Sequence, residues 1–256
     1  MPRGIVWIAA LAAALVCGCV SVQDRVALPY VASFSDSPPG EALPQGWQPW
    51  TLSRLKKATQ YKLVDESGRT VIKAQADASA SGLVHALDVD AKSFPLLTWR
   101  WKVTDLIAGA DNTQKQAEDS PVRVVVTFDG DLDKLAFDER IFSDNVKLVT
   151  GQPLPYATLM YIWENRAPRN AVSPNRHTSR VRMIVAESGR EKVGTWQDVT
   201  RNVYEDYKRV FGEEPGRITA IGIMTDTDNT GANVHAYYGD IVFLRTAPPR
   251  QMFATD

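Results

Sequence analysis

The stretch Leu97-Thr-Trp-Arg-Trp-Lys-Val103 indicates the fold class. Apolar and polar residues alternate along it without a break, so leucine, both tryptophans and valine share one face, while threonine, arginine and lysine share the other. Successive side chains of a β-strand point to opposite faces of a sheet, which makes this a strand with one buried face and one solvated face. The protein therefore contains a sheet that covers an apolar core.

Further strands are predicted on both sides of this stretch. Residues 35–49 are rich in Pro, Gly and Ser and form an irregular lead-in, and Ser67-Gly68 predicts a hairpin turn. The other strand-like segments are 59–65, 70–74, 82–89, 122–128, 158–163, 180–186, 218–224 and 236–244.

One segment has a clear helical pattern. Residues 200–211 carry apolar residues at helical spacing, with Thr200 as the expected N-cap and Gly212 as the end. Residues 138–146 are compatible with shorter helical turns only. Many strands with a single firm helix argue against alternating βαβ units. We therefore predict a mainly β protein, a jelly-roll-like antiparallel β-sandwich with one clear helix.

The N-terminus indicates export. Residues 5–16 form an apolar run of about a dozen residues, which is too short to span a bilayer and is typical of a removable signal. The following Val16-Cys-Gly-Cys19 resembles the bacterial lipobox, which is cleaved before an acylated cysteine, here Cys19. We expect a signal peptide (1–18), a lipid-anchored tether and irregular lead-in (19–45), a single β-sandwich domain (46–246) and a tail (247–256).

These features predict a protein of the bacterial cell envelope that faces the periplasm, anchored by its N-terminal lipid at the outer membrane. If Cys19 is not acylated, a soluble periplasmic protein is expected instead. The net charge of −1 provides no basic field for nucleic acid. Both cysteines lie at the signal boundary, so an acylated Cys19 leaves no thiol for a disulfide or a metal.

The segment Met224-Thr-Asp-Thr-Asp-Asn-Thr-Gly231 is the richest in polar groups. Asp226, Asp228 and Asn229 offer hard oxygen ligands, so a calcium site is one reading, although the EF-hand pattern fails. A second reading is a turn whose side chains bond their own backbone. A third is a ligand-binding or catalytic role. On a continuing strand, Asp226 and Asp228 would lie about 7 Å apart, near the lower edge of the spacing in inverting glycosidases, with Glu164 as a third acid.

The alternation of side chains along the strands places several arginines on polar faces. Arg100, Arg123, Arg180 and Arg182 would form a surface for carboxylates or sulfates if their strands lay side by side in one sheet. The alternative is an outer face with ordinary cross-strand ion pairs. Tyr156 or Trp163 would add a stacking surface for a ligand.

Several ordered motifs resemble one bacterial family, the domain of unknown function 3047. They lie at residues 44–47, 79–82, 97–102, 155–163, 175–182, 224–231 and 238–241. The resemblance covers about residues 30 to 245 and implies a single domain, an envelope location and no assigned reaction. The final strand also resembles the last strand of jelly-roll carbohydrate-binding modules, which bears on fold more than on function.

Three functions remain open at this stage. The first is an envelope lipoprotein that binds a glycan or another polar ligand, with arginines as donors and the acidic turn as acceptors or calcium ligands. The second is a carbohydrate-active hydrolase or lyase that uses Asp226, Asp228 or Glu164. The third is a structural or assembly lipoprotein that binds a partner protein.

Overall fold

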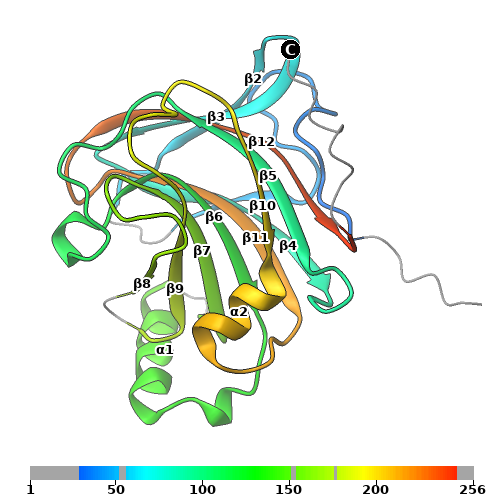
Figure 1. Cartoon of the computed structure of the whole chain (residues 1–256), viewed down its shortest axis with the longest axis vertical. Helices are drawn as coiled ribbons and strands as arrows, with labels where there is room; N and C mark the ends of the chain where they lie inside the picture. The colour runs from blue at the N-terminus through cyan, green and yellow to red at the C-terminus, as the bar shows by residue number, and fades with distance from the viewer. Residues whose placement is uncertain (1–28, 52–55, 151–153, 176–177, 247–256) are drawn as a thin grey trace, which may run out of the picture.

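The computed structural model describes residues 29–51, 56–150, 154–175 and 178–246 (Figure 1). The predicted signal peptide, Cys19 and the tail from residue 247 lie outside these described residues. Within them, no helix is long and apolar enough to cross a bilayer.

The described residues form two packed β-sheets (Figure 1). The seven-stranded sheet has the order β1-β4-β11-β6-β7-β9-β8, and the five-stranded sheet has the order β10-β5-β12-β3-β2. The first consists of β1 (Trp47–Trp50), β4 (Ala80–Val89), β11 (Ile218–Asp226), β6 (Ser120–Phe128), β7 (Ala157–Glu164), β9 (Val181–Ser188) and β8 (Val172–Pro174). The second consists of β10 (Gln197–Asn202), β5 (Leu96–Val103), β12 (Asn233–Leu244), β3 (Arg69–Asp77) and β2 (Gln60–Glu66).

The predicted fold class is confirmed, with one addition to the topology. Every strand pairing named in these sheets is antiparallel except β7 with β9, which is parallel. The predicted hairpin joins β2 to β3, and Ser67 and Gly68 adopt φ angles of 57° and 81° there. A two-residue hairpin turn that matches the twist of the strands requires positive φ at both of its central residues.

The core lies between the two sheets and follows from strand alternation. In β5, the leucine, tryptophans and valine of the stretch 97–103 are at most 3% exposed, as the pattern predicts. Trp99 packs against Tyr161 of β7 with ring centroids 5.1 Å apart, and Trp101 faces Trp163 at 6.5 Å. These large rings join the sheets, because each buried aromatic side chain contributes about 1.5–3 kcal/mol of hydrophobic stabilisation.

Two helices lie at one end of the sandwich (Figure 1). The helix α2 (Val203–Phe211) begins later than expected, because the preceding residues form β10 along the edge of β5. Its N-cap is Asn202, whose side chain accepts a hydrogen bond from the Glu205 N–H, and not Thr200. Gly212 ends it at φ 74°, as predicted. The helix α1 (Phe137–Thr150) is a full 14-residue helix where only short turns were expected.

Candidate functional site

The outer face of the seven-stranded sheet carries the candidate site. On β6, Val122, Val124 and Val126 point into the core, so the intervening side chains point outward. The outward residues of the central strands are largely apolar and pack together. This outer apolar cluster consists of Ala80, Val125 and Met224, with Trp50 and Met160 packed against it.

A groove of about 470 Å³ lies over this face at Trp50. Trp50 is partly buried and pairs with Gly82 of the neighbouring strand. A Cβ atom on Gly82 would lie 2.9 Å from the indole carbon Cε3, so the glycine lets the indole lie against the sheet. Gly222 and Val125 line the groove beside the ring, and Val146 of α1 lies at its border.

A second, polar pocket of about 300 Å³ lies on the same outer face of the sheet. Met224 and Arg123 lie in this pocket, two residues along their strands from the groove residues Gly222 and Val125. The outer apolar cluster connects the two hollows because Met160 and Met224 also line the polar pocket. Its polar lining residues are Lys56, Lys115, Glu118, Arg123, Asn175, Asp226 and Asn229.

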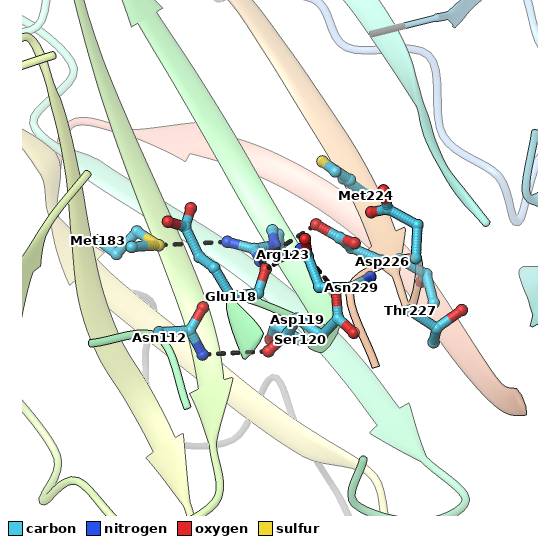
Figure 2. A network of polar contacts seen from close by, with 12 residues as sticks. Asn112, Glu118, Asp119, Ser120, Arg123, Met183, Met224, Asp226, Thr227 and Asn229 are labelled. Atoms are coloured by element: carbon cyan, nitrogen blue, oxygen red, sulfur yellow. Dashed lines mark hydrogen bonds and ion pairs between the residues drawn. The ribbon is translucent and has the colours of Figure 1, made fainter. Parts of the chain in front are cut away.

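Arg123 is the central side chain of the polar pocket and is only 2% exposed. One guanidinium nitrogen, Nη2, donates to the Glu118 carbonyl at 2.8 Å and to Asp226 Oδ2 at 3.2 Å, and the other, Nη1, lies 3.2 Å from the Met183 sulfur. Figure 2 shows the arginine extended between these groups. Its two terminal nitrogens are therefore engaged within the protein, while its buried Nε has no hydrogen-bond partner, and its main role is to neutralise and position Asp226.

Three carboxylates converge beside Arg123, and two of them, Asp119 and Asp226, are labelled in Figure 2. Asp119 precedes β6, Asp226 ends β11, and Asp228 lies in the turn that follows. One oxygen of each lies within 4.8 Å of the others. The expected separation of about 7 Å for Asp226 and Asp228 is wrong, because β11 ends at Asp226 and the chain turns there.

The electrostatic environment differs among these carboxylates. Burial and the neighbouring Asp119 and Asp228 raise the pKa of Asp226 well above its usual value, and Arg123 only partly opposes this. Burial also acts to raise the pKa of Asp119, but hydrogen bonds from Asp226, Thr230 and the backbone outweigh it and lower that pKa. Asp119 therefore carries the charge and Asp226 holds a proton more readily.

Asn229 supports this cluster from the turn. Its backbone N–H and side-chain amide each donate to Asp119 Oδ1 at 3.2 Å, while Thr230 donates to Oδ2 from its backbone at 2.8 Å and its hydroxyl at 2.6 Å. The turn is thus bound to the start of β6. Asn229 contributes its amide hydrogens here, and the third acid beside Asp226 and Asp228 is Asp119.

The four arginines do not share one surface, so that prediction is wrong. Arg100 lies on β5 in the five-stranded sheet, whereas Arg123 lies on β6 in the other sheet. Arg180 and Arg182 lie near α2, where their guanidinium groups contact Phe211 at 4.9 Å and 6.0 Å. They are not arranged as one receptor for anions.

Arg180 instead holds Tyr156 against the α2 end of the sheet. Its guanidinium lies 4.1 Å from the Tyr156 ring centroid, donates to the Tyr156 carbonyl and pairs with Glu213 at 2.7 Å. Ala157 pairs with Phe128, five residues along β6 from Arg123, which corresponds to about 16 Å of strand. Tyr156 is thus remote from the polar pocket.

Trp163 and Glu164 also have internal roles. Trp163 is 0% exposed, so the expectation that its ring stacks on a ligand is wrong. Glu164 is 5% exposed, and its carboxylate accepts hydrogen bonds from Asn112 and from the N–H groups of Arg166 and Ala167. Burial acts to raise the pKa of Glu164, but these hydrogen bonds outweigh it and lower that pKa. Glu164 orders the chain after β7 and does not face the acidic cluster.

Sequence reasoning missed Trp50 and Asp119 as site residues. The alternation in Trp47-Gln-Pro-Trp50 was a usable signal, because a buried Trp47 places Trp50 on the opposite face. No comparable signal existed for Asp119. Its position beside Asp226 depends on the pairing of β6 with β11, which is irregular between Met224 and Asp226.

Comparisons with known proteins give a family and distant structural similarities. No curated protein sequence matches the chain. A family 11 carbohydrate-binding module from Clostridium thermocellum, solved with a mixed-linked tetrasaccharide, is 9% identical, covers 80% of this chain and 91% of its own, and has a TM-score of 0.40. The xyloglucanase domain of NopAA from Sinorhizobium fredii, solved with cellobiose, is 10% identical, covers 82% and 99%, and also scores 0.40.

Similarity at this level says nothing about the ligand of this chain. The sequence family is established independently of it. The model of the family described as "Protein of unknown function (DUF3047)" matches residues 45–242, as the sequence motifs predicted, and the chain therefore belongs to this family.

Proposed function

We propose that the outer face of the seven-stranded sheet binds a glycan. A sugar ring would lie on Trp50 in the groove, and the hydroxyl groups of a neighbouring sugar would reach the polar pocket. The observation that carries this proposal is the partly open Trp50 ring, seated over Gly82 and joined to the polar pocket by the outer apolar cluster.

The chemistry of both hollows suits a sugar chain. Sugars present apolar C–H faces, which pack on flat aromatic rings, and hydroxyl groups, which need convergent hydrogen-bonding partners. The groove provides an indole ring and small residues, and the polar pocket provides carboxylates, amides and ammonium groups. Because both signs of charge line the pocket, it favours a hydroxyl-rich ligand over a strongly anionic one.

The carboxylate geometry does not support the hydrolase alternative. Glycosidases place their two carboxyl groups about 5–5.5 Å or about 6.5–9.5 Å apart, with the scissile bond between them. Here one oxygen of each acid lies within 4.8 Å of the others, and Asp226 and Asp228 are paired with Arg123 and Lys56. The nearest oxygens are thus closer together than in either glycosidase arrangement.

The cellular setting of this proposal follows from the N-terminal sequence. An acylated Cys19 would place the domain in the periplasm, where envelope glycans are available. The lipid would then hold the sandwich at the membrane, and the sandwich would bind its ligand from the membrane surface.

The test compares two tryptophans on opposite outer faces. Trp50→Ala alters the groove, and Trp196→Ala alters the outer face of the five-stranded sheet, where Trp196 lies beside Arg100 and Tyr237. The full chain and both variants are run by affinity electrophoresis in gels containing soluble β-glucan, xyloglucan or solubilised peptidoglycan. Calorimetry on any polysaccharide that retards the wild type then gives the affinity.

We expect wild type and Trp196→Ala to be retarded equally, and Trp50→Ala to bind about 10–30-fold more weakly. One ring face of about 75 Å² corresponds to about 2 kcal/mol at the usual hydrophobic coefficient. If no polysaccharide retards the wild type, or if both variants bind as well as the wild type, the proposed function is wrong.

A further inference from the structure

Two buried carboxylate oxygens in the acidic cluster have no hydrogen-bond partner. They are Oδ1 of Asp226, a residue only 6% exposed, and Oδ1 of Asp228. In both residues the other oxygen, Oδ2, is already held by a cationic side chain, Arg123 for Asp226 and Lys56 for Asp228. Buried acceptors without a donor cost stability, and a buried carboxylate oxygen is the costliest kind.

Apart from a proton shared among the three carboxyl groups, no group in the described part of the chain supplies the missing partner. Asp119 lies beside both residues; it is oriented by four hydrogen bonds from Asn229 and Thr230. Three carboxylates thus face one another with only two cationic side chains beside them. A cation bound among them would offset the excess of carboxylate groups.

The donor set specifies the kind of ion. Carboxylate oxygens are hard ligands, and the described residues bring no histidine or thiol to the cluster, which argues against zinc and copper. Ca²⁺ binds oxygen at about 2.3–2.6 Å, so two of its ligands lie at most about 5 Å apart, whereas Mg²⁺ at about 2.1 Å allows only about 4 Å. One oxygen of each carboxylate lies within 4.8 Å of the others, which is within the reach of Ca²⁺.

We propose that Asp119, Asp226 and Asp228 bind one Ca²⁺ ion beside the polar pocket. The ion would join the start of β6, the end of β11 and the turn after it. This revises the calcium site expected from the sequence, because Asp119 replaces Asn229 as the third protein ligand. The site is separate from the glycan proposal, since binding of the ion requires no sugar.

The test measures calcium binding without any glycan. The full chain is treated with EDTA, dialysed and titrated calorimetrically with CaCl₂ and, separately, with MgCl₂. Thermal unfolding is recorded in parallel. We expect one Ca²⁺ per chain, weaker binding of Mg²⁺, and a Tm increase of roughly 5–10 °C at a calcium concentration one hundred times the Kd.

Three substitutions locate the ion. Asp228→Asn removes a ligand that is 17% exposed and should weaken calcium binding at least tenfold. Lys56→Gln removes a competing ammonium group whose side chain is 39% exposed, and should tighten binding by about fivefold. The control is Asp198→Asn, which removes an acid that pairs with Arg100 on the other sheet, and it should leave calcium affinity unchanged.

Two outcomes would overturn the proposal. One is a folded wild type that shows neither heat nor a Tm shift with Ca²⁺ up to about 10 mM, which is about ten times the weakest Kd of extracellular calcium modules. The other is calcium binding that neither Asp228→Asn nor Lys56→Gln alters. If Asp228→Asn does not fold, Lys56→Gln alone shows whether calcium binds at this cluster. This variant should fold, because the Lys56 side chain is 39% exposed.

Discussion

Replacing Arg123 by methionine tests how the polar pocket is held together. Arg123 is 2% exposed and Asp226 is 6% exposed, and Arg123 Nη2 lies 3.2 Å from Asp226 Oδ2. The substitution leaves Asp226 buried without its counter-ion, and breaking buried ion pairs in this way costs about 3–5 kcal/mol. For a domain of this size, we expect Tm to fall by roughly 6–20 °C.

The matched control is Arg190→Met. Arg190 lies 2.7 Å from Asp105, a shorter distance than in the buried pair, but the two side chains are 69% and 59% exposed. Exposed pairs contribute at most about 1 kcal/mol, so this variant should unfold close to the wild type in urea. Equal losses of stability in the two variants would refute the reasoning, because burial and not distance sets the expected difference.

The pH dependence provides a second check on the same substitution. Burial and the adjacent carboxylates raise the folded-state pKa of Asp226 above its ordinary 3.8. The contribution of this group to stability is therefore complete below about pH 4 and is lost as the pH rises through the folded-state pKa. Without Arg123 the folded-state pKa of Asp226 rises further, so the free energy of unfolding continues to fall up to a higher pH. The additional loss is about 1.4 kcal/mol for each unit by which this pKa rises.

The free energy of unfolding of Arg123→Met should accordingly fall further below that of the wild type at pH 8 than at pH 5. Urea denaturation at both pH values measures this difference. A difference that is larger at pH 5 would contradict the assignment of the penalty to an ionised Asp226.

Two further predictions concern other parts of the chain. Glu164→Gln weakens the acceptor that orders the chain after β7, so it should cost about 1–3 kcal/mol in urea unfolding while leaving glycan affinity unchanged; a loss of affinity at full stability would instead give Glu164 a direct role. Cys19→Ala should abolish the incorporation of labelled palmitate in a bacterial host and release the protein from membranes, and labelling that persists in this variant would contradict acylation at Cys19.

The architecture was predictable because strand alternation is a local property. The pattern of residues 97–103 determines which side chains enter the core, whatever the strand pairs with. The length of helix α1 was underestimated because its apolar residues do not follow a pattern of burial. Phe137, Ile141 and Leu148 are 72%, 45% and 83% exposed, so its apolar residues do not mark a stripe that faces the core.

The site was less predictable because it depends on which strands become neighbours. Parity places Arg100 and Arg123 on outward faces correctly, but consecutive strands of a sandwich often belong to different sheets, and these two do. Asp119 and Asp226 are 107 positions apart and meet only through the pairing of β6 with β11. No local pattern encodes that register, including its irregularity beside Asp226.

The contrast between the two outer faces argues for the position of the binding surface. On the five-stranded sheet, the outward charges are neutralised locally, as in the Lys102–Glu66 and Arg100–Asp198 pairs, and the rings of Trp196 and Tyr237 lie against Arg100 and Lys102. This is the usual state of a solvated sheet face. The seven-stranded sheet departs from it, because Trp50 and Met160 lie partly open beside a buried Arg123. The proposed glycan would cover the apolar groups of this outer face, and the proposed ion would offset its buried carboxylates.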